Sequence, residues 1–301
     1  MSAPRSRGHR ARGRTPRDPP IRLVATDLDG TLVGADLVIR PRVAAAVAAV
    51  QARGVIVVIA TGRMYRSTLR FARALDLRAP LICYQGAYVR EMPLAGQAAP
   101  APIRHVTLAP DVAREAIRWS RDNGLDPHVN RDDRLVMERG DEGAEDYERL
   151  SGIDAEFVPD LLAAVDRPVT KVLAVGRPGL AERVLGAGRE AFGGRAEVTV
   201  SHPEYLEFTA PGVTKGQALR WLARRLRIPL AATMAIGDQH NDLEMLAAAG
   251  HGVAMAGSPA EVRAAARHVT ATVEEEGLAL ALEALVLGRG TLDGDDRDGR
   301  S

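Results

Sequence analysis

The stretch from Val55 to Ala60 is a continuous run of apolar, mostly β-branched residues, and it constrains the fold more than any other segment. A run without polar alternation suits a strand that is covered on both faces, as in a parallel sheet. Segments of matching kinds surround it: strand-like runs at 21–26 and 81–84, and helical patterns at 41–53 and about 65–75. This alternation predicts an α/β fold, a doubly wound parallel sheet with helices on its faces.

The alternation stops after the third strand-like run and resumes near Tyr205. Residues 91–102 are rich in Pro, Ala and Gly, which is typical of a linker. Beyond them, a helix at 111–123 and a strand at 169–175 follow in an α+β order. Near the C-terminus we expect helices at 213–226 and 241–249, strands at 233–237 and 253–255, and a helix with Ser258 as its N-cap. The pattern predicts a discontinuous core domain at 20–88 and 203–287, interrupted by an α+β domain at 89–202.

The two ends of the chain differ in composition from the rest. Residues 1–19 are rich in Arg and Pro, and residues 288–301 are acidic and rich in Gly, so we expect both tails to be disordered. A transit peptide or a nucleic-acid-binding tail would also be Arg-rich, but Pro and Gly interrupt any amphipathic helix and no aromatic residues are interleaved. The net charge of +1 argues against a polyanion binder, and no apolar run is as long as a membrane span. We expect a cytoplasmic protein whose partners include neither nucleic acid nor membrane.

The first candidate site is Asp27-Leu28-Asp29-Gly30, directly after the first strand-like run. In open α/β sheets, ligands bind beyond the carboxyl ends of the strands, where these residues are expected. Two carboxylates in a glycine-containing turn offer oxygen ligands for Mg²⁺, and they repel each other unless a cation is present. The alternatives are an ordinary Asp-Gly turn and a calcium loop, although the further acids of an EF-hand are absent at the required spacing.

Two further signals mean little by themselves. Thr61 and Gly62 follow the run at 55–60 and offer a hydroxyl and an approachable backbone, but Thr-Gly is also a common turn. Lys215 stands at a helix start, where the helix dipole disfavours a cation unless an anion is bound there. A solvated lysine is the simpler interpretation of that position.

The fourth signal is Gly237-Asp238-Gln239-His240-Asn241-Asp242, again after a strand. Asn241 and Asp242 can cap the helix that follows, which would explain both residues without a site. Asp238 would instead add a third carboxylate to a metal site. The order of the four signals along the chain is more specific than any one of them.

In this order, the strand-end Asp-x-Asp-Gly-Thr, the strand-end Thr-Gly, the helix-start Lys and the strand-end Gly-Asp-x-x-Asn-Asp resemble the motifs of the haloacid dehalogenase-like superfamily, and within it the Cof-type phosphatases. The resemblance spans about residues 21–285. It implies a Rossmann-like core with a large α/β cap of type IIB inserted between the second and third motifs, which is where the interruption falls. Gln85 departs from the pattern, because many relatives have Asn there, so the substrate geometry need not be that of the family.

The resemblance implies a Mg²⁺-dependent phosphatase that acts on a small phosphorylated metabolite through an aspartyl-phosphate. Asp27 would be the nucleophile, and Asp29 would protonate the leaving oxygen and then activate water. Thr61, Gly62 and Lys215 would hold the phosphoryl oxygens.

The same resemblance implies the metal ligands. Asp27, Asp238 and the backbone carbonyl of Asp29 would bind Mg²⁺. Asp242 would support the metal directly or through water, and Asn241 would contact the phosphate. Mg²⁺ and Lys215 together would let an anionic carboxylate approach an anionic phosphate.

Alternatives to this function remain open at the level of sequence. A phosphomutase of the same superfamily would share every core residue. A non-catalytic regulator that binds a phosphorylated ligand would be expected to have lost Asp27 or Asp29, and both are present. The glycines at 186 and 188 loosely match a dinucleotide fingerprint, but the helical pattern at 180–185 argues against it.

The inserted domain gives no legible specificity signal. We expect its polar residues His128, Arg131, Arg134 and His202 at the surface rather than against the substrate. The oligomeric state is expected to be a monomer or a homodimer.

Overall fold

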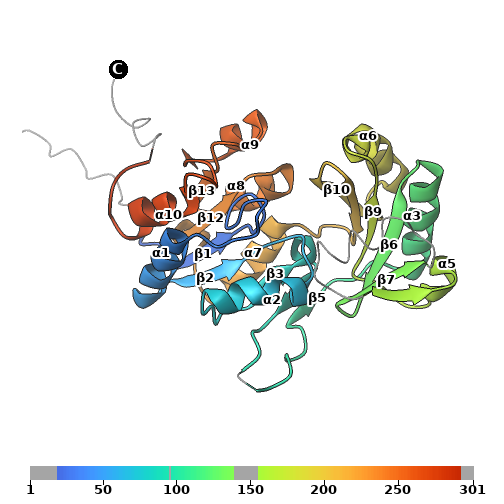
Figure 1. Ribbon diagram of the computed structural model, residues 1–301, viewed down its shortest axis with the longest axis horizontal. Helices are drawn as coiled ribbons and strands as arrows, with labels where there is room; N and C mark the ends of the chain where they lie inside the picture. Colours follow the sequence, from blue (N-terminus) through green and yellow to red (C-terminus); the bar gives the residue numbers. More distant parts are fainter. Residues whose placement is uncertain (1–18, 95, 139–154, 293–301) are drawn as a thin grey trace, which may run out of the picture.

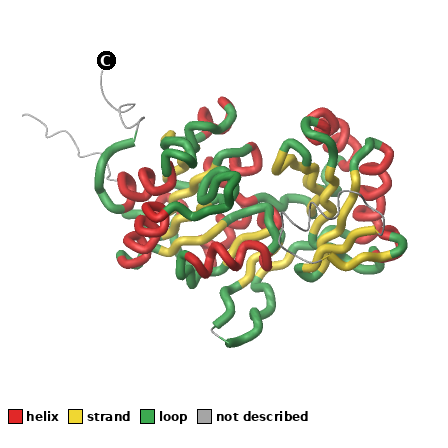
Figure 2. Tube along the Cα trace, in the orientation of Figure 1, coloured by secondary structure: helices red, strands yellow, loops and turns green. Residues whose placement is uncertain are grey.

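The computed structural model describes residues 19–94, 96–138 and 155–292, and the structural statements below concern these residues. Two regions lie side by side, each with its own sheet and helices (Figure 1). In Figure 2, the strands of the second region lie between its helices and the first region. The disorder expected for the two tails concerns mainly residues 1–18 and 293–301, which lie outside the described residues.

The first region, here called the core, is built on a five-stranded parallel sheet in the order β14-β13-β12-β1-β2. This topology confirms the α/β fold class that the alternation predicted. The strands are β1 (Leu23–Thr26), β2 (Ile56–Ile59), β12 (Thr233–Gly237), β13 (His251–Ala254) and β14 (His268–Val269).

Helices cover both faces of this sheet, which explains why its strands are apolar without alternation. Along β1, Val24 packs into one apolar cluster, and Leu23 and Ala25 pack into the cluster on the opposite face. The first cluster includes residues of α1 (Pro41–Ala52), α2 (Tyr65–Ala74) and α10 (Gly277–Ala281), which the π-helix η4 (Leu282–Val286) continues. The second includes residues of α7 (Lys215–Arg225), α8 (Leu243–Ala248) and α9 (Ala260–Ala265).

A small antiparallel sheet extends the core beside β2. It consists of β3 (Leu81–Cys83), β4 (Tyr88–Arg90) and β5 (Arg104–His105), with the 3₁₀ turn η1 (Tyr84–Gly86) between the first two strands. A single parallel bridge from Ala60 to Ile82 connects it to the main sheet.

The second region, here called the cap, has a six-stranded sheet in the order β10-β11-β9-β6-β7-β8. Its helices α3 (Pro110–Asp122) and α6 (Leu180–Phe192) lie on the side away from the core (Figure 1). The short helix α5 (Leu161–Ala164) packs into the same apolar cluster. The strands are β6 (Asp126–Arg131), β7 (Arg134–Glu138), β8 (Ala155–Val158), β9 (Lys171–Val175), β10 (Glu197–His202) and β11 (Tyr205–Thr209).

The strand pairing divides the two regions at different residues from those expected. β4 and β5 pair with β3 of the core, although the insertion was expected to begin at 89. β11 pairs with β9 and β10, so the cap sheet continues to Thr209 rather than ending at 202. The composition change near 91–102 marks a connection within the small sheet, which only long-range strand pairing reveals.

Several local expectations need correction. Ser258 is not the N-cap of α9, because the helix begins at Ala260 and Pro259 occupies the N-cap position. The buried Ser258 hydroxyl also makes no hydrogen bond among the described residues. The helix expected at 241–249 starts as the 3₁₀ turn η3 (His240–Asp242) before α8. Residues 288–292 of the expected tail are among the described residues, and Leu292 packs into the core cluster. Gly186 and Gly188 lie inside α6, as expected.

No helix among the described residues is long and apolar enough to cross a membrane.

Candidate active site

The predicted site residues gather at the carboxyl ends of three adjacent strands. Asp27 follows β1, Asp238 follows β12, and Thr61 comes two residues after the end of β2. Because β12, β1 and β2 are neighbours and parallel, these ends meet at one edge of the sheet. The separate sequence signals therefore belong to one place.

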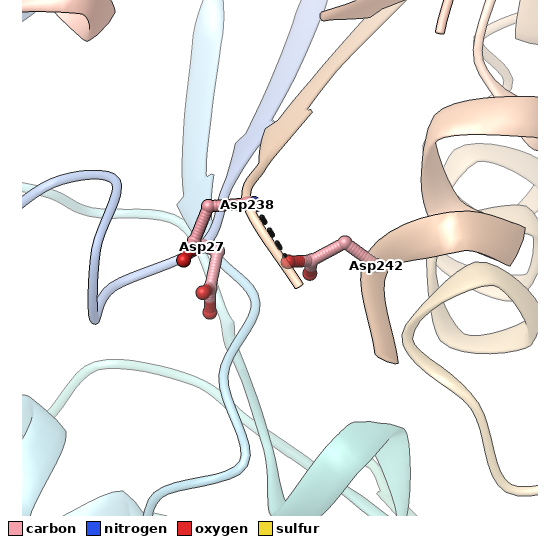
Figure 3. A group of neighbouring side chains, drawn as sticks. All are labelled: Asp27, Asp238 and Asp242. Atoms are coloured by element: carbon pink, nitrogen blue, oxygen red, sulfur yellow. Dashed lines mark hydrogen bonds between the residues drawn. The ribbon is translucent and has the colours of Figure 1, made fainter. Parts of the chain in front are cut away.

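Asp27, Asp238 and Asp242 form an acidic triad, with one carboxylate oxygen of each lying within 4.8 Å of the others. In Figure 3, Asp27 and Asp238 extend from strand ends and Asp242 approaches from the neighbouring helical segment. Gly237 makes this approach possible, because a Cβ there would lie 2.4 Å from the Asp242 carboxyl carbon. Gly30 likewise leaves room for the Asp238 carboxylate, since a Cβ on Gly30 would lie 2.3 Å from Asp238 Oδ2.

Lys215 connects two members of the triad. Its Nζ donates hydrogen bonds to Asp27 Oδ1 at 2.7 Å and to Asp242 Oδ1 at 2.8 Å, and the side chain is almost fully buried. Burial by itself lowers the pKa of Lys215, but the charges of Asp242 and Asp27 outweigh it, so the net pKa lies above the ordinary value. Lys215 is therefore a fixed positive charge, and the interpretation of a solvated lysine is wrong.

Burial and the charge of Lys215 shift the pKa values of Asp27 and Asp238 in opposite directions. Burial raises the pKa of Asp27 well above its ordinary value, and the charge of Lys215 offsets this only in part. Burial, followed by the charge of Asp242, raises the pKa of Asp238 to about 6. Three carboxylates with one ammonium group leave an excess of negative charge when all are ionised, and a bound cation would relieve it.

The donor set fits a hard divalent cation such as Mg²⁺. Within the described part of the chain, the side-chain oxygens of Asp238 accept only from the Thr31 hydroxyl and the Gln239 amide, and Asp27 Oδ1 accepts only from Lys215. Both Asp242 oxygens are already engaged, Oδ1 by Lys215 and Oδ2 by the backbone N–H groups of Asp238 and Gln239. Asp27 and Asp238 are the available ligands, and Asp242 holds Lys215 and the turn in place.

Asp29 lies apart from the acidic triad. Its two carboxylate oxygens accept from Arg63 Nε at 2.7 Å and Arg63 Nη2 at 2.6 Å, a bidentate ion pair. A contribution of Asp29 to a metal site through its backbone carbonyl stays a prediction. The sequence suggested no role for Arg63, although the residue stands directly after Thr61-Gly62 at a strand end.

The residues predicted to hold phosphate are linked through Gln85. Asn241 Nδ2 donates to Gln85 Oε1 at 3.1 Å, and Gln85 Nε2 lies so close to Gly62 that a Cβ there would be 2.4 Å from it. Gln85 is buried with a φ of +57°, and its Nε2 makes no hydrogen bond among the described residues. Thr61 is buried beside them, and its Oγ1 accepts from the Arg63 N–H. The departure at Gln85 thus lies between two predicted phosphate contacts.

The site opens into a cavity of about 490 Å³ between the core and the cap. Asp27, Asp29, Asp238 and Lys215 line its core side. The cap side includes Lys171, Leu173, Ser201, His202, Tyr205 and Glu207. A cavity of this volume can enclose a small organic molecule.

The four polar cap residues expected at the surface behave differently from one another. Arg134 is exposed, as expected, and the exposed His202 lines the cavity. The expectation is wrong for His128, which is fully buried beside Asp126, and for Arg131, whose guanidinium is largely covered beside Asp166. Both lie in strand β6 inside the sheet, and burial there depends on strand order rather than on residue type.

Comparisons with known proteins agree with this arrangement. Residues 24–282 match the family model described as haloacid dehalogenase-like hydrolase. An HMP-PP phosphatase of Serratia proteamaculans is 32% identical over 237 residues, covering 78% of this chain and 83% of the relative. The 5-amino-6-(5-phospho-D-ribitylamino)uracil phosphatase YitU of Bacillus subtilis is 29% identical over 266 residues, covering 87% and 96%. The crystal structure of a haloacid dehalogenase-like hydrolase from Bacteroides thetaiotaomicron superposes with a TM-score of 0.75 at 26% identity, covering 88% and 99%.

Proposed function

The chain belongs to the haloacid dehalogenase-like hydrolases and is a phosphatase, and from this premise we propose that it hydrolyses a small phosphorylated metabolite through a phosphoenzyme formed on Asp27. The observation that carries the proposal is the contact of the buried Asp27 with Lys215 at the floor of the cavity. This contact aligns a carboxylate beside a fixed positive charge, which favours the approach of a phosphate dianion.

The proposed reaction has two halves. An Asp27 oxygen attacks phosphorus while the bond from phosphorus to the ester oxygen breaks, and the leaving oxygen takes a proton from Asp29. Water then attacks the phosphoenzyme and gives a proton to Asp29, the bond between Asp27 and phosphorus breaks, and inorganic phosphate leaves. Each half moves one proton, so Asp29 returns to its starting state.

Asp29 must separate from Arg63 before it can serve as an acid, because the guanidinium occupies both carboxylate oxygens. The Asp29 side chain is about half exposed and that of Arg63 about one-fifth exposed, so both can reorient. A phosphate group entering the cavity would offer Arg63 an alternative anion. The ion pair would then be the resting arrangement of the ionised Asp29, which would take up a proton from solvent after Arg63 leaves and before the first half of the reaction.

We place Mg²⁺ at Asp27 and Asp238, with Asp242 behind them. When bound there, the ion would neutralise phosphate charge during transfer. Lys215, Thr61, Gly62 and Asn241 would contact phosphate oxygens, since all four line the cavity near Asp27. The names of the two relatives fit a phosphorylated small molecule as the substrate class.

The test is phosphate release from a panel of phosphorylated metabolites and p-nitrophenyl phosphate in the presence of Mg²⁺. The Asp27→Asn variant should lose at least about 10³-fold in turnover, because a neutral amide is a poor nucleophile. Asp76→Asn is the matched control, since Asp76 is a highly exposed aspartate remote from the cavity. Turnover by Asp27→Asn close to that of the control would refute the phosphoenzyme.

A further inference from the structure

The cap wall of the cavity carries a buried ion pair that the proposed chemistry does not use. Lys171 Nζ lies 2.9 Å from Glu207 Oε1, and each side chain is only 3% exposed. The two residues stand on the adjacent strands β9 and β11. Their chain neighbours Val172 and Phe208 pack into the cap cluster under the helices, so Lys171 and Glu207 point to the opposite face, which borders the cavity.

Lys171 also joins the cap to the core. Its Nζ donates to the backbone carbonyl of Gly62 at 3.1 Å and lies 5.7 Å from the centre of the Tyr84 ring. Gly62 belongs to the turn that carries Thr61, so the ion pair is held beside the proposed phosphate contacts. A direct hydrogen bond therefore connects the cap wall to the turn that carries Thr61.

The composition of the chain supports a specific requirement for lysine at this position. The sequence contains 40 Lys and Arg residues together, and Lys171 and Lys215 are its two lysines. Both lie in this cavity, and both contact carboxylates. An ammonium group is a compact point charge, whereas a guanidinium is a planar fork, so arginine is not an equivalent replacement for lysine in a small buried space.

Glu207 has an unused acceptor. Its Oε1 accepts from Lys171 and from the Ser201 hydroxyl at 2.6 Å. Its Oε2 is buried and has no hydrogen-bond partner among the described residues. A buried acceptor without a partner is costly, and a carboxylate can accept only from donor groups. Because Glu207 lines the cavity, a donor on a ligand in the cavity can supply the missing hydrogen bond.

We propose that Glu207 is a specificity-determining residue, whose carboxylate accepts a hydrogen bond from a hydroxyl or N–H group on the organic part of the substrate, and that Lys171 is the positioning residue that holds it. The inference rests on the proposed function, because the phosphate is taken to occupy the core end of the cavity. The pair is charge-balanced, so this wall suits a neutral, donor-bearing group. A carboxylate or second phosphate on the substrate would meet Glu207 and be disfavoured.

The test compares donor-bearing monoesters with a donor-free one. Ribose 5-phosphate, sorbitol 6-phosphate and pyridoxamine 5′-phosphate carry hydroxyl or amino donors, and p-nitrophenyl phosphate carries none. The wild type should show a higher kcat/KM for the best donor-bearing substrate. In Glu207→Gln, Lys171 should retain the amide oxygen, so the amide NH₂ takes the place of Oε2 and a donor meets a donor. The preference should fall about 10- to 100-fold, mainly through KM, as expected for a lost hydrogen bond to a charged group.

The matched control is Glu156→Gln, which makes the same change in β8 of the same sheet, outside the cavity lining, where the side chain is 46% exposed. It should leave the preference unchanged. No preference in the wild type, or an equal preference in Glu207→Gln, would overturn the inference. Lys171→Arg should also reduce the preference, because the fork cannot hold Glu207 in the same place.

Two further measurements keep the outcomes separate. If Glu207→Gln does not fold, as judged by circular dichroism, the double variant Lys171→Met/Glu207→Leu removes both charges without leaving one buried alone. It should be folded and lack the preference, and a retained preference would overturn the inference.

If the wild type releases phosphate from no substrate, the proposed function fails, and calorimetric binding then tests the inference by itself. Ribose 5-phosphate, sorbitol 6-phosphate or pyridoxamine 5′-phosphate should bind the wild type more tightly than inorganic phosphate does. In Glu207→Gln, the ratio of these two affinities should be about tenfold smaller. Equal advantages in the two proteins would refute it.

Discussion

The two lysines of the chain stand in two different charge environments, Lys215 on the core side and Lys171 on the cap side of one cavity. Lys215 contacts two carboxylates of the acidic triad, which leaves excess negative charge at the core end. Lys171 contacts one carboxylate, Glu207, which leaves the cap end balanced. Excess negative charge favours a cation and then a phosphate, whereas a balanced pair favours neutral polar groups. The core end is therefore suited to chemistry, and the cap end to selection.

The largest expected effect isolates the proton transfer at the core end. Asp29→Asn should lower turnover about 10²- to 10⁴-fold, because an amide cannot donate or accept the proton. Rapid-quench measurement of phosphate release would determine the loss. The exposed Asp166→Asn of the cap is the matched control and should be fully active. Turnover by Asp29→Asn close to that of the control would contradict the role of Asp29 as the general acid and base.

Replacing each lysine by arginine tests the two charge environments directly. Lys215→Arg should lower kcat/KM for p-nitrophenyl phosphate about 10²- to 10³-fold, because a misplaced charge no longer aligns Asp27. Lys171→Arg should lower it about tenfold or less, since this substrate has no donor for Glu207. Both variants keep the charge, and circular dichroism would check their folding. Equal losses would show that the two ends do not divide the work as proposed.

Magnesium binding should distinguish the two ends without any turnover. At about 100 times its dissociation constant, Mg²⁺ should stabilise the wild type by about 2.7 kcal/mol, which raises Tm by several degrees. Asp238→Asn should lose this shift, while Glu207→Gln should retain it because the cap pair lacks excess negative charge. Differential scanning calorimetry would measure both. A full shift in Asp238→Asn would contradict the proposed metal ligands.

The smallest expected effect is a pH-dependent change in the free energy of unfolding at Asp133. This residue lies in the cap turn between β6 and β7 and forms hydrogen bonds with the core. Asp133 Oδ1 accepts from the Tyr84 hydroxyl at 2.8 Å and from the Tyr65 N–H at 3.0 Å. Burial raises its pKa above the ordinary value, and the Tyr84 hydrogen bond offsets this only in part. Such a group contributes stability that is present at low pH and lost as pH rises through its raised pKa.

Asp133→Asn retains an oxygen acceptor but cannot ionise. Its stability relative to wild type should therefore increase from pH 4 to pH 7, by about 1 kcal/mol or less. Urea unfolding at both pH values would measure the change. Asp132→Asn, in the exposed neighbouring position of the same turn, should show no such trend. A relative decrease for Asp133→Asn would mean that the ionised carboxylate stabilises the contact.

The fold class and the acidic end of the cavity could be predicted from the sequence because their signals are local. A strand covered on both faces is apolar throughout, and its carboxyl end is followed directly by the residues that meet the ligand. Asp27, Thr61 and Asp238 each stand next to such a strand, so knowing that the strands are parallel is enough to bring them together. Arg63 was visible in the same turn, but only the structure reveals that its guanidinium holds Asp29.

The cap end of the cavity was decided by tertiary structure alone. Lys171 and Gly62 are 109 residues apart, and nothing near either residue in the sequence indicates their contact. The assignment of β11 to the cap sheet has the same origin, because antiparallel pairing with β9 joins distant segments. Local patterns thus predicted the acidic wall of the cavity, whereas the packing of two sheets determined which cap side chains line the cavity beside it.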